Sequence, residues 1–269
     1  MRTVQLPISR IPDALSANIG ALKDFYLEVS SGREPGYSTV NKFGNDPALG
    51  AGVTNPIWDG STTYTWPSSA DITHIWSAVD SATTRGVVVE VQGLDASWAL
   101  TVQNVTTDAA DSTTEVGLTT ALRRVFRMKV LDPSVMDQNL RVGPTGKASF
   151  QAQVSIGDNQ TLMAIYTIPA GKTGYMTNYY ISLNKVSGGG NPDLLTKLWA
   201  RDNDNGYASW IKHVIGLDAD ANSYINQTFN PYFKITEKTD VWLEATELTG
   251  GGGVIADVSG GFDLILEDN

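Results

Sequence analysis

Residues 87–103, VVVEVQGLDASWALTVQ, decide the fold class of this chain. Apolar residues occupy every second position from 87 to 91, and after a turn at Gly93 the alternation resumes from 98 to 102. An apolar residue at every second position is the pattern of a strand that buries one face. The stretch therefore predicts two strands joined by a short turn.

The same alternation recurs at 126–130, 241–246 and 262–267, and glycines fall mostly between these patterns. Asn205-Gly206 is the sharpest hairpin signal, because a two-residue hairpin turn needs residues that tolerate positive φ. These features together predict an all-β protein.

The first 60 residues differ from the rest. From Pro12 to Val29 apolar residues recur at helical spacing, although DFYLEV at 24–29 fits a strand equally well. Residues 30–60 lack periodicity and contain three prolines, which predicts an extended arm. Such an arm would reach over a neighbouring subunit or form an ordered loop on its own chain.

A second break in the alternation, between Asp132 and Gly146, predicts a domain boundary near residue 145. The expected fold class is all-β, with two consecutive β-sandwich (jelly-roll-like) domains and an N-terminal extended or partly helical arm. The expected parts are the arm at 1–60, the first sandwich at 61–145 and the second sandwich at 146–269.

Charge argues against several classes of partner. The 269 residues include 19 Lys and Arg against 29 Asp and Glu, a formal net charge of −10. Nucleic-acid binding requires clustered Lys and Arg, so we expect no nucleic-acid partner. No stretch reaches the about 20 apolar residues that span a bilayer, no export signal is evident, and we expect no membrane partner. One basic stretch is predicted to form a solvated face: Arg123, Arg124, Arg127 and Lys129.

Three motifs resemble ligand loops but are incomplete. PAGKTG at 169–174 lacks the glycine five positions before Gly171 that a phosphate loop requires. Acidic stretches beginning at Asp202 and Asp218 lack the glutamate at the twelfth position of a calcium loop. We predict ordinary turns at all three, Asx-stabilised at the acidic two, and no metal or cofactor. A calcium site assembled from several loops stays open.

Catalytic motifs are equally sparse. The chain has no cysteine and only two histidines, His74 and His213, each in a strand-like stretch where a half-buried structural role is expected. Neither a nucleophile elbow nor a zinc-binding helix accompanies them. We therefore expect no catalytic residue and no enzymatic activity. A glycosidase-like carboxylate pair stays open, because its separation is a property of the fold.

The seven tryptophans are spread through different strand and loop patterns, and core filling is the expected use of most of them. Trp58, in NPIWDGSTTYTW, is the best candidate for an exposed contact, because aromatic faces on a sandwich stack against sugar rings.

Several segments resemble a family of virion structural proteins from environmental, often marine, tailed bacteriophages. The likeness begins in VNKFGNDPALGAGVTNPIWDGSTTYTWPSSA at 40–70, in which IWDG is the most recognisable element. It continues through VVVEVQGLDASW at 87–98, LRRVFRMKVL at 122–131 and TLMAIYTIPAGKTGYM at 161–176. The resemblance implies an assembly role, as a capsid decoration, a head fibre or a tail-associated piece.

The expected function is therefore that of a virion structural protein, such as a capsid decoration or cement protein. It would act through contacts with other capsid or tail proteins and as a homo-oligomer, with a trimer favoured. Two alternatives remain: a receptor- or glycan-binding module that touches the host surface, and a polysaccharide-degrading enzyme.

Overall fold

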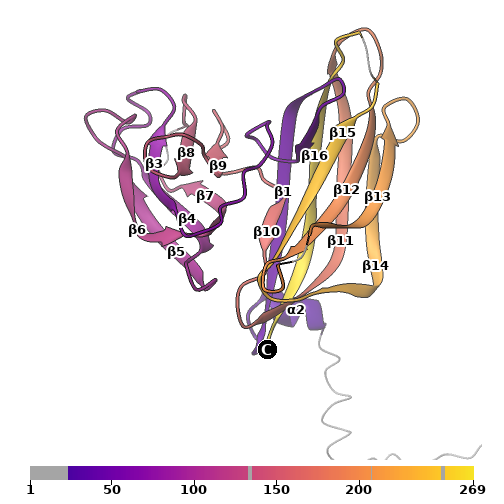
Figure 1. Ribbon diagram of the computed structural model, residues 1–269, viewed down its shortest axis with the longest axis horizontal. Helices are drawn as coiled ribbons and strands as arrows, with labels where there is room; N and C mark the ends of the chain where they lie inside the picture. The colour runs from indigo at the N-terminus through magenta and orange to yellow at the C-terminus, as the bar shows by residue number, and fades with distance from the viewer. Residues whose placement is uncertain (1–23, 133–134, 207, 250–251) are drawn as a thin grey trace, which may run out of the picture.

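The computed structural model describes residues 24–132, 135–206, 208–249 and 252–269, which form two packed sandwiches of antiparallel strands (Figure 1). The larger sandwich contains β1 (Tyr37–Gly50), β2 (Thr54–Pro56), β10 (Ile165–Thr167), β11 (Lys172–Ser187), β12 (Asp193–Asp202), β13 (Trp210–Asp218), β14 (Tyr224–Ile235), β15 (Thr239–Glu247) and β16 (Ile255–Asp268). The smaller sandwich contains β3 (Ile72–Ser77), β4 (Val88–Leu94), β5 (Leu100–Thr106), β6 (Val116–Leu122), β7 (Arg124–Val130), β8 (Leu140–Gly143) and β9 (Ala152–Val154). The predicted all-β class is confirmed.

The larger sandwich has the connectivity of a jelly roll. One sheet has the order β1-β16-β11-β14 and the other β10-β15-β12-β13, and β2 continues the line of β10 along β15. With its eight principal strands numbered along the chain, the two sheets read 1-8-3-6 and 2-7-4-5. Two four-stranded sheets with these orders are the two interleaved Greek keys of a jelly roll.

The smaller sandwich is inserted between the first two strands of the jelly roll. Its sheets have the orders β6-β3-β8-β9 and β5-β4-β7, and the chain enters it after β2 and leaves it before β10. It lies against the side of the jelly roll where β1 and β10 are found, and β13 and β14 lie on the opposite side (Figure 1). One edge of the jelly roll is therefore covered and the other is not.

The prediction of an extended arm at 30–60 is wrong, because most of this segment is strand. β1 pairs with β16 from Tyr37↔Glu267 to Gly50↔Ile255, and β2 pairs with β15. Buried positions of β1 carry Lys42, Gly44 and Asp46 rather than apolar residues, which hides the alternation. At Gly44 an added Cβ would lie 2.3 Å from the carbonyl oxygen of Ile57, so only glycine fits.

The expected boundary near residue 145 also differs from the structure. β9 pairs with β8 in the register Leu140↔Val154, so the smaller sandwich extends past that point, and the larger one is discontinuous in sequence. The break in alternation at 132–146 spans the loop before β8, the strand itself and the turn that follows it. The two sandwiches are nested rather than consecutive.

Only the end of the predicted helix lies within the described residues. Of the two alternatives for DFYLEV, the structure shows the helix, α2 (Phe25–Ser30). The Asp24 side chain accepts hydrogen bonds from the backbone N–H groups of Tyr26 and Leu27. An aspartate that binds the free N–H groups of the first turn is an effective N-cap. The remainder of the expected helix, 12–23, lies outside the described residues.

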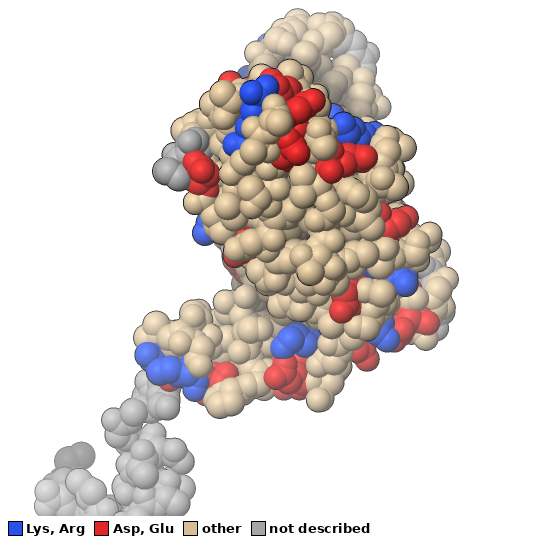
Figure 2. Space-filling view, turned by 90° about the vertical axis from the view of Figure 1, so that its left-hand side faces the viewer, with Lys and Arg blue, Asp and Glu red and all other residues tan. Residues whose placement is uncertain are grey.

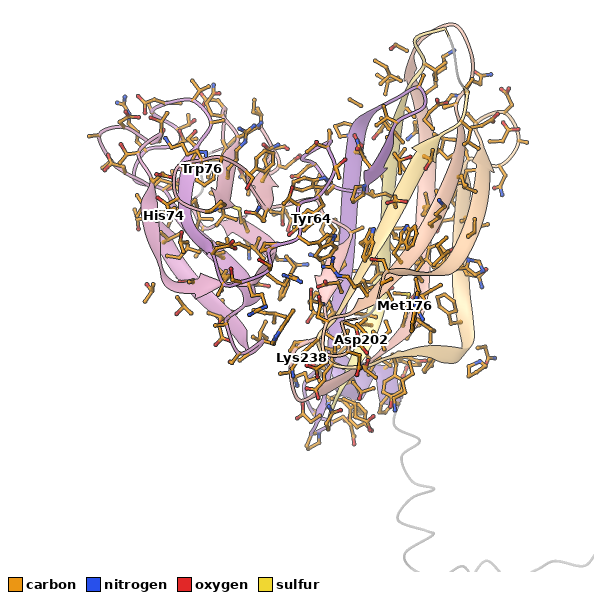
Figure 3. The ribbon with its side chains drawn as sticks, viewed as in Figure 1. Tyr64, His74, Trp76, Met176, Asp202 and Lys238 are labelled. Atoms are coloured by element: carbon orange, nitrogen blue, oxygen red, sulfur yellow. The ribbon has the colours of Figure 1, made fainter. Side chains whose placement is uncertain are left out.

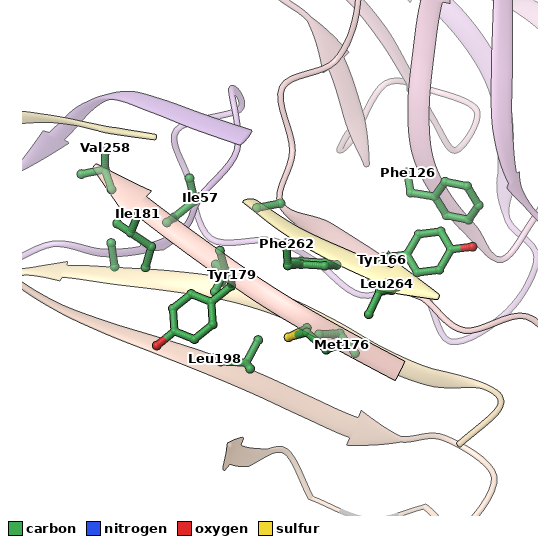
Figure 4. Close-up of a cluster of buried hydrophobic side chains, with 14 of the residues drawn as sticks. Ile57, Phe126, Tyr166, Met176, Tyr179, Ile181, Leu198, Val258, Phe262 and Leu264 are labelled. Atoms are coloured by element: carbon green, nitrogen blue, oxygen red, sulfur yellow. The ribbon is translucent and has the colours of Figure 1, made fainter. Parts of the chain in front are cut away.

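Each sandwich has a hydrophobic core, and each core takes in residues of the other: Leu94 and Phe126 join that of the jelly roll, Ile165 and Trp242 that of the smaller sandwich. In the jelly roll, alternate residues of β11 and β16 meet between the sheets, among them Met176, Ile181, Phe262 and Leu264 (Figure 4). In the smaller sandwich, the inward residues of β4 and β7 do the same. A hairpin connects β12 to β13 as predicted, but the two-residue turn is wrong: β12 ends at Asp202 and β13 begins at Trp210, and of the pair Asn205-Gly206 only Gly206 has a positive φ, +62°.

Candidate functional site

The two sandwiches meet around a buried carboxylate. Asp240, on β15 of the jelly roll, has a side chain with no exposed surface. Arg124, on β7 of the smaller sandwich, binds it through Nε–Oδ1 and Nη2–Oδ2 hydrogen bonds of 2.8 and 3.1 Å. Arg201, on β12, donates from Nη2 to Oδ2 at 2.5 Å. Paired contacts between a guanidinium and a carboxylate are strong and directional, so this pair fixes how the sandwiches dock.

Neutral groups complete the shell of Asp240. The hydroxyl of Thr167 donates to Oδ1 at 2.6 Å and the amide of Asn203 to Oδ2 at 2.8 Å. The remaining nitrogen of Arg124, Nη1, donates to the carbonyl oxygen of Pro67 at 2.6 Å. Two guanidiniums and one carboxylate leave this cluster with a net positive charge inside a protein whose net charge is −10.

The predicted solvated basic face is therefore wrong at Arg124, which is 3% exposed. Arg124 stands in phase with the buried Phe126, Met128 and Val130 of β7, whereas Arg127 is half-buried and Lys129 is exposed. The phase of an arginine relative to apolar neighbours on a strand is a usable signal. It marks Arg124 as an inward residue that needs a buried partner.

A second contact lies along the covered edge of the jelly roll. Lys42 of β1 is buried and donates from Nζ to the carbonyl oxygen of Phe126, and the ring of Phe126 packs on Tyr166 with centroids 4.7 Å apart (Figure 4). Burial, aided by the nearby Arg127, holds the pKa of Lys42 well below its ordinary value. The smaller sandwich thus covers a lysine that an isolated jelly roll would expose.

Aromatic rings form a continuous row through the junction, in contrast to the expected spread of the tryptophans. Tyr64, labelled in Figure 3, lies between the sandwiches with its ring centroid 4.8 Å from that of Trp66. Trp66 contacts Trp242 at 5.1 Å, and Trp242 stacks on Trp199 at 5.9 Å and 8°. Because the rings come from separate strands and loops, only the folded chain brings them together.

Trp58 extends this row and is not a surface residue. Its side chain is 1% exposed, packs edge-on against Tyr64 at 5.2 Å and donates from Nε1 to the carbonyl oxygen of Thr62 at 2.6 Å. A Cβ on Gly60 would lie 2.4 Å from the indole ring, so glycine is required beside it. The candidate exposed contact is a core residue, because the loop after β2 folds back over its ring.

A cleft of about 400 Å³ opens beside the buried cluster. Its wall combines guanidinium, indole and amide groups from both sandwiches, from Trp66, Trp98, Arg123, Arg124, Arg201 and Asn203. Arg201 lies 4.6 Å from the centre of the Trp66 ring, and Arg123 lies 4.8 Å from that of Trp98. A cation over an indole face is attracted by the ring electrons, so cation–π interactions stabilise the positions of these arginine and tryptophan side chains.

Trp98 adopts an unusual backbone conformation at the rim of this cleft. Its φ is +66°, in the left-handed region that bulky residues rarely occupy. Asp95 accepts hydrogen bonds from the N–H groups of Ser97 and Ala99, which holds the turn, and Ala170 of the jelly roll donates to the Trp98 carbonyl oxygen at 3.0 Å. The turn therefore places this indole against both sandwiches at some cost in backbone strain.

The acidic loops are Asx turns, as predicted. Asp202 accepts hydrogen bonds from the N–H groups of Asp204 and Asn205, and Asp218 accepts one from the N–H of Asp220. Burial tends to raise the pKa of Asp202, but hydrogen bonds from Asn205 and Asp204 hold it below its ordinary value. The carboxylate of Asp202 is thus committed to its own turn.

The remaining motifs fall at separate places. PAGKTG forms the predicted turn, with Gly171 at φ +73°, and leads into strand β11 rather than a helix. His213 is half-buried, 2.5 Å from the hydroxyl of Tyr179, and His74 lies on the smaller sandwich away from the junction (Figure 3). In the described ranges no three His, Cys, Asp or Glu side chains gather as a metal-binding group. The described part of the chain also has no helix with the length and hydrophobicity of a membrane span.

The edge of the jelly roll away from the smaller sandwich carries several exposed large apolar side chains. β13 and β14 each pair with a strand on one side only. Five residues along them are between 42% and 55% exposed: Trp210, Ile211, Val214, Tyr224 and Tyr232. A surface hollow of about 640 Å³ adjoins Tyr232 and is bordered by Tyr26 of helix α2. We refer to these five residues as the apolar edge.

The side of the smaller sandwich carries charged residues of both signs, in contrast to the apolar edge. Figure 2 shows Lys and Arg side chains interspersed with Asp and Glu on that side, around broad uncharged areas. Strands β5 and β6, LTVQNVT and VGLTTAL, contain no charged residue. No basic patch dominates the face seen in this view.

Topology defines the class of this protein as a jelly roll with a second sandwich inserted after its first strand. No protein-family model matches the sequence, and no curated protein matches it significantly. A chain in the structure of infectious bursal disease virus, Gx strain, is 12% identical, covers 87% of this chain and 75% of its own length, and has a TM-score of 0.21. A chain of T=1 particles derived from infectious bursal virus is 11% identical, with coverages of 86% and 72% and a TM-score of 0.18. Scores this low are not evidence of a shared function.

Asp59 is a buried carboxylate that accepts only two long hydrogen bonds. Its Oδ2 accepts from the N–H of Leu162 at 3.2 Å and the hydroxyl of Ser155 at 3.4 Å, whereas Oδ1 is buried without a hydrogen-bond partner. Burial raises the pKa of Asp59 to about 8. At neutral pH the folded protein therefore holds a proton there that the unfolded chain releases.

Replacing Asp240 with asparagine should destabilise the protein strongly, by about 3–5 kcal/mol, because the buried Arg124 and the partly buried Arg201 lose their counter-charge. Urea unfolding measures the change. Asp204→Asn is the matched control, since Asp204 forms an ion pair with Lys238 at an exposed site, where solvent screens the interaction. Equal effects of the two substitutions would contradict the assignment of Asp240 as the centre of the junction.

The raised pKa of Asp59 predicts a pH dependence. The contribution of Asp59 to stability should decrease as pH rises from about 4 to about 8, because the folded state keeps a proton that the unfolded chain gives up near 3.8. Asp59→Asn is neutral in both states, so its urea midpoint should exceed that of the wild type by more at pH 9 than at pH 5. The exposed Asp71→Asn serves as control. An identical difference at both pH values would show that Asp59 is ionised in the fold.

Proposed function

We propose that this chain is a structural protein of a bacteriophage particle, a capsid decoration, cement or other surface component that acts through protein-protein assembly. The observation that carries the proposal is the apolar edge. These exposed apolar residues suit contact with other subunits, and the sequence resembles virion proteins of tailed phages, so both observations favour the same role.

The apolar edge needs a cover. A free edge strand presents unpaired N–H and C=O groups, and soluble proteins usually protect such edges with charge, bulges or a covering element. The opposite edge of this jelly roll is protected in that way by the smaller sandwich. On β13 and β14 tryptophan, tyrosine, isoleucine and valine are exposed between polar residues of β14 such as Asn226, Thr228 and Lys234, and exposed aromatic residues are typical of protein interfaces.

The proposed partners are copies of this chain and the neighbouring capsid or tail proteins. Homo-oligomers are mostly closed and symmetric, so a contact between the apolar edge and another face of the next copy would close into a ring. The resemblance to phage decorations and fibres favours a trimer. The hollow beside Tyr232 could seat a side chain from the adjacent subunit.

The fold is compatible with this role. Jelly rolls occur in viral capsid proteins, in lectins and in cupins, so the architecture leaves both structural and binding functions open. We propose a non-enzymatic function, since no catalytic motif was found in the sequence and the buried carboxylates Asp240 and Asp59 lie at separate positions in the packing.

Mass spectrometry of gradient-purified particles of the encoding phage tests the proposal. The polypeptide should be present at the copy number of a structural component, in a simple ratio to the major capsid protein. Its absence from particles that are intact by electron microscopy would rule out the virion role.

The apolar edge predicts the effect of one substitution on assembly. Val214→Lys places a charge in the edge and should shift the oligomer to monomer in analytical ultracentrifugation, because an unpaired charge is costly to bury in an interface. Val102→Lys is the matched control: Val102 is 54% exposed on β5 of the smaller sandwich, against 46% for Val214. Dissociation by Val102→Lys but not by Val214→Lys would place the interface on the smaller sandwich instead.

A further inference from the structure

We propose that the cleft between the two sandwiches binds a carboxylated sugar, a uronate or sialate unit of an acidic glycan. This inference concerns recognition of a ligand and is independent of the assembly role. It rests on the composition of the cleft, on its charge and on two features that cost the free protein stability.

The cleft has the composition and size of a small ligand site. Its volume of about 400 Å³ lies within the range of roughly 300–1,000 Å³ that is usual for such sites. Clefts between domains are common positions for them. Here the smaller sandwich contributes Trp98 and Arg123, and the jelly roll contributes Arg201 and Asn203.

Arg123 supplies a charge that the protein does not neutralise. Arg124 and Arg201 share Asp240, and the carboxylate of Asp202 is held by its own turn. Arg123 has no ion pair with a described residue: its Nη1 donates to the carbonyl oxygen of Ser68 at 2.8 Å, and its guanidinium lies over Trp98. Three guanidiniums against two carboxylates leave one net positive charge around the cleft.

A net charge of one matches a carboxylate better than a phosphate ester, which carries nearly two negative charges near neutral pH. Arginine also matches the planar carboxylate group, because its N–H donors form a fork that binds both oxygens. Arg201 spends Nε and Nη2 on Asp240, and its Nη1 has no hydrogen-bond partner among the described residues. Arg123 and Arg201, one from each sandwich, therefore both offer donors to the cleft.

Indole groups favour a sugar over a carboxylate side chain of another protein. Trp98 and Trp66 both line the cleft. Arg123 and Arg124 already lie over the Trp98 ring, and Trp66 is likewise contacted by Arg124 and Arg201. A sugar ring would therefore place its apolar C–H face beside these indoles and its planar carboxylate on the arginines. A glutamate or aspartate side chain offers the anion alone.

Two features of the cleft are not optimised for stability. Trp98 is held at φ +66°, and Nε of Arg123 is buried without a hydrogen-bond partner. Backbone strain and unpaired polar groups occur preferentially where a protein binds or reacts, because function rather than stability selects them. Both features belong to the residues that the proposal assigns to the ligand.

The test uses the full chain and titration calorimetry with trigalacturonate and with sialyllactose as probes. At least one of the two should bind, whereas a neutral galactose trimer should not. Arg123→Gln removes the charge but keeps a polar side chain with N–H donors, and should weaken binding at least tenfold. Arg123→Lys keeps the charge without the fork and should bind with intermediate affinity. Thermal unfolding establishes that both variants are folded.

Arg127→Gln is the matched control, since Arg127 lies on β7, which begins directly after Arg123, and it carries the same charge and is not part of the cleft. It should bind the probe as the wild type does. Equal weakening by Arg127→Gln would reduce the effect to general electrostatics and overturn the proposal. So would the absence of binding by both acidic sugars, or equally tight binding of a tetraglutamate peptide, which would assign the cleft to a protein carboxylate.

Discussion

The arrangement of the two sandwiches depends on one buried carboxylate. Asp240 is fully enclosed, yet two arginines from different sandwiches and two neutral donors converge on it. An ion cluster taken out of water contributes little net stability, but it tolerates almost no change in geometry. We infer that its main effect is specificity: it selects one relative orientation of the sandwiches, and the aromatic row, the covered lysine and the cleft all follow from that orientation.

The two faces of the molecule differ because of this docking. At the covered edge, the smaller sandwich shields the end strands of the jelly roll and encloses Lys42. At the other edge, the described residues offer no comparable cover beyond the contact of Tyr26 of helix α2 with Tyr232. A protein with one protected and one unprotected edge is suited to directional association, and a ligand cleft on the line between the sandwiches stays outside the apolar edge. Assembly and ligand recognition can thus be assigned to separate surfaces.

Sequence patterns predicted the parts of this fold in which burial and hydrophobicity coincide. The strands around residues 87–103 and the hairpin between β12 and β13 follow directly from alternation and turn chemistry. β1 escaped prediction because Lys42, Gly44 and Asp46 occupy its buried positions. The prediction for Arg124 fails for the same reason, because a charged residue occupies a buried strand position. Its charge favoured an exposed side chain, whereas its phase on β7 indicated a buried one. The aromatic row and the cleft could not be predicted from one sequence, because their members become neighbours only through long-range pairing.

The pairing of β1 with β16 also determines the order in which the chain can fold. Tyr37 lies beside Glu267, so the first strand of the jelly roll must wait for the last one, and contacts this distant in sequence form slowly. The inserted sandwich, by contrast, contains all of its own strands between β2 and β10. During synthesis it can form its core while the jelly roll is incomplete, and it then offers a preformed surface with Arg124 in place. The insertion thus acts as a built-in template, against which the later strands of the jelly roll assemble.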